Sequence, residues 1–285
     1  MSKLFFLGAG KMATAIAGGI VKAEVFQKAE LAAFDVSPKA ADEFEQKTGV
    51  RCYWGGADSL LFRGKDGAEE CGGALRKIVE QADAVLLAVK PQVLASALEP
   101  LAGCLAGKPV ISIVAGVPID RLAGLTGSGR IVRVMPNTPA LVGEGAAGYS
   151  LAPEAQAADG ELANRILSAV GVAMQVDEKY LTAVTALSGS GPAYVFEFIR
   201  ALSDGGVAEG LPRDVATKLA IQTVLGSAAM AKETGIHPAI LKDQVTSPGG
   251  TTIRALEVLE DRAFAGAVIA AVRACARRSE ELGKN

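Results

Sequence analysis

The pattern of apolar residues changes near the middle of the chain, from short continuous runs to helical spacing. The first half contains short continuous apolar runs at residues 3–7, 31–35, 84–89, 110–114 and 131–135. Each run is followed by a break rich in glycine, proline or polar residues. Such runs are typical of parallel strands that are covered on both faces. The first half is therefore predicted to be an α/β domain built on a parallel sheet.

From Pro153 onward the pattern is helical, apart from VAMQV at residues 172–176. Apolar residues stand at helical spacing in residues 161–171, 215–233 and 254–282. The other faces carry few charges, especially around residues 215–231, and a helix that is apolar nearly all round is buried. It can be buried inside one well-packed bundle or against another subunit. We expect the second arrangement, an oligomer, with domains at 1–152 and 153–285.

Residues 8–13, GAGKMA, connect the first apolar run to a helical segment and follow the pattern G-x-G-x-x-A. Gly8 permits a tight turn, Gly10 lets a pyrophosphate approach the backbone, and Ala13 lets the helix pack close to the strand. The pyrophosphate would then lie at the helix N-terminus. The pattern predicts a Rossmann-type dinucleotide-binding domain, against the alternative of an ordinary βα turn.

Asp35 ends the second apolar run, near the distance at which an acidic residue meets the ribose hydroxyls of a dinucleotide. An aspartate there repels the additional phosphate of NADP, but Ser37 and Lys39 follow and could bind it. The choice between NADH and NADPH therefore stays open. The alternative for Asp35 is a turn or capping role before the helix that begins near Pro38.

Further candidate residues follow the later strands, because ligands of an open parallel sheet bind outside the carboxyl ends of its strands. A plain loop role is the alternative for each of them. Thr138 lies on the same edge. The predicted cofactor-binding residues are Gly8, Gly10, Lys11, Met12, Asp35, Ser37, Ala88, Lys90, Pro91, Ala115, Gly116 and Asn137.

Two breaks interrupt the helical half. LSGSGPAYVF at residues 187–196 places Pro192 in the first turn of a new helix, with Ser190 or Gly191 as its cap. VTSPGGTTI at residues 245–253 contains a proline and two glycines, which no continuous helix accommodates. The second break is either a loop or a helix N-terminus whose free N–H groups bind an anion.

Composition excludes several classes of protein. The formal charge is −2 and we find no dense Lys/Arg block, so nucleic acid is not an expected partner. The four cysteines are widely separated and His237 is the single histidine, so no metal site is expected. Reduced thiols in a cytoplasmic protein are expected. No apolar run is long enough to predict a membrane span. Residues 53–77 are interpreted as an irregular excursion without assigned function.

Several motifs together resemble the pyrroline-5-carboxylate reductase family, nearly from end to end. They are FLGAGKMATAIAGG, AVKPQ, IVAGV, RVMPNTPALVGEG, LSGSGPAYVF, DGGVAEGLPRDVA, GSAAM and LKDQVTSPGGTTI, in that order. The resemblance implies reduction of 1-pyrroline-5-carboxylate to L-proline with NADPH or NADH, the last step of proline biosynthesis. It also implies an N-terminal cofactor domain and a helical domain that forms an interlocked homodimer. In the family this dimer is often assembled further into a decamer, a ring of dimers.

The resemblance also assigns the second break. Ser247, Gly249, Gly250 and Thr251 are implied to bind the substrate carboxylate, largely through main-chain N–H groups and hydroxyls. The Thr252 hydroxyl is implied to face the ring nitrogen. His237, which precedes Pro238 in an expected loop, is predicted to lie at the surface and to take no part as an acid.

Two other functions are compatible with the same architecture. The first is a different imine or β-hydroxyacid reductase. A hydroxyacid dehydrogenase would normally use a lysine of the helical region as acid or base, and Lys218 is available but lies on a segment interpreted as packing. A regulatory protein that binds the dinucleotide without turnover is the non-enzymatic alternative, because a fold alone does not establish catalysis.

Overall fold

The computed structural model describes residues 3–56, 60–64, 67–71 and 75–283. The chain divides into two compact units. The sheet unit comprises Met1–Gly189 and Ala276–Asn285, and the helical unit comprises Ser190–Cys275. The sheet unit therefore extends beyond the predicted boundary at 152/153, and that functional division stays a prediction. Within the described ranges, none of the helices combines the length and the apolar character required to cross a bilayer.

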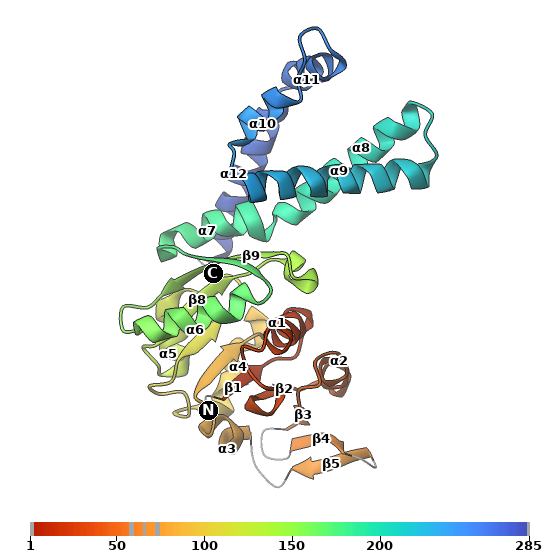
Figure 1. The fold of residues 1–285 in the computed structure, drawn as a ribbon. Coiled ribbons are helices and arrows are strands. Elements are labelled where there is room, and N and C mark those ends of the chain that lie inside the picture. The colour runs from red at the N-terminus through yellow and green to blue at the C-terminus, as the bar shows by residue number, and fades with distance from the viewer. Residues whose placement is uncertain (1–2, 57–59, 65–66, 72–74, 284–285) are drawn as a thin grey trace. The chain divides into compact units, whose positions relative to one another are not determined.

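The described strands of the sheet unit form one ten-stranded sheet, in the order β10-β9-β8-β7-β6-β1-β2-β3-β4-β5. Figure 1 shows the β4–β5 pair beyond β3. Strands β8, β7, β6, β1, β2 and β3 are parallel neighbours. The strands are β1 Leu4–Leu7, β2 Leu31–Asp35, β3 Cys52–Gly55, β4 Leu60–Gly64, β5 Gly67–Cys71, β6 Ala84–Leu87, β7 Val110–Ser112, β8 Ile131–Met135, β9 Gly145–Leu151 and β10 Gly171–Gln175.

The five predicted apolar strands are all present because both of their faces are buried. Phe5 and Leu7 belong to one hydrophobic cluster, and Leu4 and Phe6 belong to another, so successive side chains of β1 enter different cores. The helices that cover the sheet are α1 Lys11–Lys22, α2 Pro38–Thr48, α3 Leu75–Glu80, α4 Leu94–Leu98, α5 Ile119–Thr126, α6 Ala157–Ser168 and α7 Leu181–Val184. The prediction of a doubly covered α/β domain is confirmed.

One prediction inside this unit was wrong. Residues 53–77 are not simply irregular, because β3 continues the sheet and β4 and β5 add an antiparallel pair. The parts of that excursion at 57–59, 65–66 and 72–74 lie outside the described residues. Pairing with neighbouring strands decides the structure of this segment, and local composition does not reveal it. The run at 172–176, which the sequence analysis excluded from the helical pattern, corresponds to β10, and β10 pairs in parallel with β9.

The helical unit is built from α8 Gly191–Ala208, α9 Arg213–Thr234, α10 Pro238–Gln244, α11 Thr251–Asp261 and most of α12 Phe264–Gly283. α8 begins with Ser190 as the N-cap and Pro192 in its first turn, as predicted. The predicted helical pattern at 254–282 is divided in two, since Ala263 adopts a positive φ of 53° between α11 and α12. Alanine favours helices, so the sequence gives no sign of this break.

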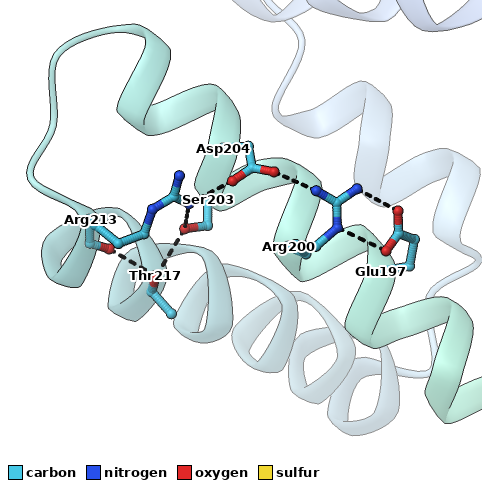
Figure 2. Close-up of polar contacts among 6 residues, drawn as sticks. All are labelled: Glu197, Arg200, Ser203, Asp204, Arg213 and Thr217. Atoms are coloured by element: carbon cyan, nitrogen blue, oxygen red, sulfur yellow. Dashed lines mark hydrogen bonds and ion pairs between the residues drawn. The ribbon is translucent and has the colours of Figure 1, made fainter.

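A chain of polar side chains fastens α8 to α9 (Figure 2). Arg200 donates to both carboxylate oxygens of Glu197 and to Asp204. Arg213 donates to the other oxygen of Asp204 at 2.7 Å and to Ser203 at 2.9 Å. The Ser203 hydroxyl lies 2.9 Å from that of Thr217. The guanidinium of Arg200 lowers the pKa of Glu197. Because the charged side chains of this network are largely exposed, we assign it a role in helix orientation and little net stability.

Candidate active site

The glycine turn lies where β1 ends and α1 begins. Gly8 has a φ of 105°, and a Cβ there would stand 2.7 Å from the carbonyl oxygen of Ala88. Only glycine fits this backbone without strain. Gly10 is the N-cap of α1 and supplies no side chain to cap it. The first N–H groups of α1, including those of Lys11 and Met12, therefore have no acceptor within the helix and suit an anion.

Asp35 fastens the glycine turn to the end of β2. One carboxylate oxygen accepts a hydrogen bond from the Ala9 N–H at 2.9 Å, and the other accepts one from the Ser37 N–H, also at 2.9 Å. Ser37 in turn caps α2, because its hydroxyl accepts a hydrogen bond from the Ala40 N–H. The structure thus supports a turn role for Asp35, which was the alternative to ribose binding, and ribose binding stays a prediction.

The other predicted cofactor residues follow the carboxyl ends of β6, β7 and β8. The Ala88 N–H donates to Leu7, beside the glycine turn. Lys90 and Pro91 are exposed and begin a short 3₁₀ helix, Pro91–Val93. Ala115 and Gly116 are exposed after β7. The structure therefore brings all these backbone segments to one edge of the sheet, together with the glycine turn.

Asn137 lies on this edge but uses its side chain internally. Its amide donates to the Ser188 carbonyl at 3.0 Å, and its amide oxygen accepts from the Ala146 N–H at 2.8 Å. The residue is buried, with 8% of its surface exposed. Its side chain braces the end of β8, so any contact it makes with a cofactor is expected from the backbone.

The predicted substrate residues lie in the helical unit, where VTSPGG separates α10 from α11. Gly249 has a φ of 65°, and Gly250 is the N-cap of α11 without a side-chain cap. The Gly250 N–H donates to the Ser247 carbonyl at 3.1 Å, which closes the turn. A Cβ on Gly250 would stand 2.2 Å from the Ser247 hydroxyl oxygen. Both glycines are thus required by the backbone or by close packing.

The start of α11 has the geometry of an anion site. The helix begins at Thr251, and its first N–H groups have no acceptor within the helix. Ser247, Gly249 and Thr251 are exposed, and Thr252 is half-buried. The structure brings these four residues and Gly250 together in one turn, while the cofactor residues belong to the other compact unit.

His237 lies at the surface, as predicted. Its Nδ1 atom accepts a hydrogen bond from the Ala239 N–H at 3.2 Å and caps α10. Among the described residues, no group of three or more histidine, cysteine or acidic side chains could hold a metal ion.

Sequence reasoning missed two features around LSGSGP. Residues Thr185–Gly189 form a π-helical turn, a rare conformation that is frequent at functional sites. Just beyond it, the Cys275 thiol donates to the Ser190 hydroxyl at 3.2 Å, and the hydrogen bond with Cys275, aided by burial, raises the pKa of Tyr194. The glycine and serine residues of LSGSGP indicate a break in the helix at this place. Nothing in the sequence predicts the hydrogen bond between Ser190 and Cys275.

Two protein families match different parts of the chain, one in the C-terminal half and one in the N-terminal half. Residues 178–282 match the family described as pyrroline-5-carboxylate reductase dimerisation. Residues 3–116 match the family described as NADP oxidoreductase, coenzyme F420-dependent. The matched ranges contain the predicted substrate residues and most of the predicted cofactor residues, respectively.

Full-length relatives carry the same name. A pyrroline-5-carboxylate reductase of Arabidopsis thaliana is 42% identical over 285 residues, covering 99% of this chain and 96% of that protein. The structure of the enzyme from Coxiella burnetii has a TM-score of 0.86 and 35% identity, covering 99% of this chain and 98% of that one. The Plasmodium falciparum enzyme, solved with NADP bound, has a TM-score of 0.81 and 34% identity, at 99% and 98% coverage. With such similarity over both compact units, the chain belongs to the pyrroline-5-carboxylate reductase family.

Proposed function

We propose that the chain reduces 1-pyrroline-5-carboxylate to L-proline with NADPH or NADH, as the last step of proline biosynthesis in the cytoplasm. The observation that carries this proposal is the uncapped start of α11, where a glycine with positive φ precedes a row of main-chain donors. Such a helix end binds a carboxylate, and the substrate has one carboxylate. Relatives named for this reaction match both compact units.

The sheet unit fits a dinucleotide cofactor. A Cβ at Gly8 would strike the Ala88 backbone, and the first turn of α1 is uncapped beside it, which leaves room and donors for a pyrophosphate. We assign this role to Gly8, Gly10, Lys11 and Met12, with Asp35 holding the turn in place. When bound, the nicotinamide supplies the hydride that reduces the C=N carbon.

The helical unit holds the substrate. Ser247, Gly249, Gly250 and Thr251 bind the carboxylate through N–H groups and hydroxyls, and the partial positive charge of the α11 N-terminus adds to the attraction. A fixed carboxylate positions the imine carbon for attack, and orientation of this kind supplies much of the rate.

Thr252 orients the ring nitrogen, and no side chain is an obligatory proton donor. His237 is exposed and already caps α10. The imine nitrogen is therefore protonated before hydride transfer, and the iminium carbon accepts hydride more readily than the neutral imine. The Thr252 hydroxyl accepts a hydrogen bond from the N–H of the iminium.

The working form is a homodimer, with further assembly into a ring of dimers, a decamer. The family matched by residues 178–282 is described by its dimerisation. Large apolar side chains are exposed on every helix of the helical unit in a single chain. We also propose that residues 1–152 carry the cofactor role and residues 153–285 the substrate and assembly roles.

The test is a cofactor-oxidation assay with 1-pyrroline-5-carboxylate, run in parallel with NADH and NADPH. A reductase consumes cofactor only when the substrate is present, whereas a regulatory protein binds cofactor without turnover. Thr252→Ala is expected to lower turnover by about 10- to 100-fold, the loss of one hydrogen bond to a charged group, with the cofactor dissociation constant unchanged. Loss of cofactor binding in this variant would contradict the assigned role.

A further inference from the structure

The loop between β2 and α2 lies beside the glycine turn that carries the proposed pyrophosphate site. The Gly8 N–H donates to the Phe34 carbonyl at 2.8 Å, and the Ala9 N–H donates to the Asp35 carboxylate at 2.9 Å. In dinucleotide-binding domains, the end of the second strand meets a ribose whose 2′ position carries a hydroxyl in NADH and a phosphate in NADPH. The residues of this loop therefore bear on the choice between the two cofactors.

The helices that follow β1 and β2 differ at their N-termini. α1 has no side-chain cap, so its first N–H groups suit an anion. α2 is capped, because the Ser37 hydroxyl accepts a hydrogen bond from the Ala40 N–H, and its first residue, Pro38, has no N–H. The Ser37 N–H is also engaged, since it donates to Asp35 at 2.9 Å. The start of α2 thus offers few free donors to a 2′-phosphate.

Asp35 places a carboxylate at the end of β2. The side chain is half-buried, and each of its oxygens accepts one main-chain N–H, so lone pairs remain for a further donor. A ribose 2′-hydroxyl supplies such a donor. A 2′-phosphate instead carries a charge of about −1.5 to −2 at pH 7, which the carboxylate repels. Lys39 is the only basic residue in the sequence from 36 to 46, and its exposed ammonium offsets little of this repulsion.

We propose that the chain prefers NADH to NADPH and that Asp35 determines this preference. The Asp35 carboxylate accepts a hydrogen bond from the ribose 2′-hydroxyl of NADH and repels the 2′-phosphate of NADPH. The capped start of α2 gives that phosphate little compensation. The inference rests on the proposed cofactor role of the sheet unit, and it does not depend on the identity of the substrate.

Fluorescence titration of the full chain with NADH and with NADPH, in the absence of substrate, tests the proposal. We expect the dissociation constant of NADPH to exceed that of NADH by about tenfold or more, because a hydrogen bond to a charged group is lost and a like charge is added. Competition of ADP-ribose and 2′-phospho-ADP-ribose against NADH should give the same order of affinity. These two ligands lack the nicotinamide, so they report on the ribose end alone.

Asp35→Asn removes the charge and keeps the size of the side chain. The ratio of the NADPH to the NADH dissociation constant should fall by about tenfold or more in this variant. A looser glycine turn would weaken both cofactors alike and leave this ratio unchanged, so the ratio separates the specificity role from the turn role. Glu43→Gln is the matched control, since Glu43 lies on α2, is exposed, and pairs only loosely with Lys47 at 4.0 Å. Its ratio should equal that of the unaltered chain.

Three results would overturn the proposal. The first is equal or tighter binding of NADPH by the unaltered chain. The second is an unchanged ratio in Asp35→Asn, which would show that Asp35 serves only the turn. The third is a loss of NADPH affinity of about tenfold or more in Lys39→Gln, where we expect a change of less than about fivefold, because Lys39 would then hold the 2′-phosphate.

The turnover assay with 1-pyrroline-5-carboxylate keeps this inference separate from the proposed reaction. Reduction of the substrate together with tighter binding of NADPH would contradict the inference and leave the proposed reaction intact. Preferential binding of NADH without turnover would support the inference and contradict the proposed reaction.

Discussion

The two compact units differ sharply in how they bury apolar surface. In the sheet unit, the strands and covering helices enclose two hydrophobic clusters, and Phe5, Phe6, Ile16 and Phe44 are almost fully buried. In the helical unit, the buried residues are Ser203, Ala216 and Ala220, all with small side chains. Phe196, Leu225, Val245 and Val258 are examples of its large apolar residues, each more than half exposed.

This contrast shows that the helical unit is incomplete as a single chain. Monomeric proteins rarely leave most large apolar side chains of a helical unit exposed, and exposed apolar surface of this kind marks interfaces. The family described by its dimerisation matches this part of the chain. We therefore attribute the missing core to a second copy, whereas the sheet unit carries a core of its own.

The largest expected effect comes from placing a charge in the proposed interface. Leu225 lies on α9 and is 56% exposed in a single chain. Leu225→Asp would bury an unpaired carboxylate in the dimer, which costs several kcal/mol, so the dimer dissociation constant should rise by about 1000-fold or more. Sedimentation velocity measures this change.

The control is Gln46→Asp, which adds the same charge to an exposed position of α2 in the sheet unit. It should leave the mass in solution unchanged. An unaltered dimer in Leu225→Asp would mean that α9 faces solvent, and the contrast between the units would then need another cause.

A smaller effect is expected from the glycine turn, which belongs to the unit with its own core. Gly8→Ala forces a side chain into a positive-φ backbone and against Ala88. The turn must shift, and we expect the cofactor dissociation constant to rise by about 10- to 100-fold while the dimer persists. Fluorescence titration measures the affinity.

Gly18→Ala provides the matched comparison on α1, the helix that follows the glycine turn, because no atom lies within 4 Å of a Cβ at Gly18. Its cofactor affinity should equal that of the unaltered chain. If the two variants bind cofactor equally well, the glycine turn is not the pyrophosphate site.

The substrate turn belongs to the other unit, and its change should leave cofactor binding intact. Gly249→Val places a branched side chain beside the first N–H groups of α11, so the KM for substrate should rise about tenfold or more, since contacts to the carboxylate are lost. Steady-state kinetics measures it.

Gly235→Val controls for backbone strain. Gly235 has a φ of 64°, close to the 65° of Gly249, and both glycines have open space around them. Only Gly249→Val should raise KM. Equal values in both variants would reduce VTSPGG to an ordinary loop.

The smallest effect is expected at His237, the single histidine. Since it is exposed and caps α10, His237→Gln should keep turnover within about twofold of the unaltered chain. A thousandfold loss would show that the imidazole donates the proton, contrary to the mechanism proposed here.

The sequence predicted those parts of the fold that depend on continuous burial. β2 and β8 have the predicted bounds, because both faces of these strands are covered and the apolar run ends where the strand ends. The fold class and the family are confirmed. By contrast, the β4–β5 pair lies in a segment rich in glycine and charge, and pairing with neighbouring strands overrides that composition.

The sequence predicted where the candidate site residues lie along the chain better than it predicted the hydrogen bonds that their side chains make. The turn at Gly249 and Gly250 was visible from residue types that helices exclude. The role of Asp35 was not, since its partner Ala9 is 26 residues away and the sequence offered two readings. The hydrogen bonds of the Asn137 side chain amide with Ser188 and Ala146 were likewise not predictable. The assigned substrate and cofactor residues themselves stay a prediction.

A crystal structure of the dimer with cofactor and L-proline would test most directly the claim that the start of α11 binds the substrate carboxylate. We predict that the proline carboxylate lies within hydrogen-bonding distance of the main-chain N–H groups at the start of α11, beside Thr252. A carboxylate bound elsewhere, with the turn at Gly249 and Gly250 holding only water, would contradict it.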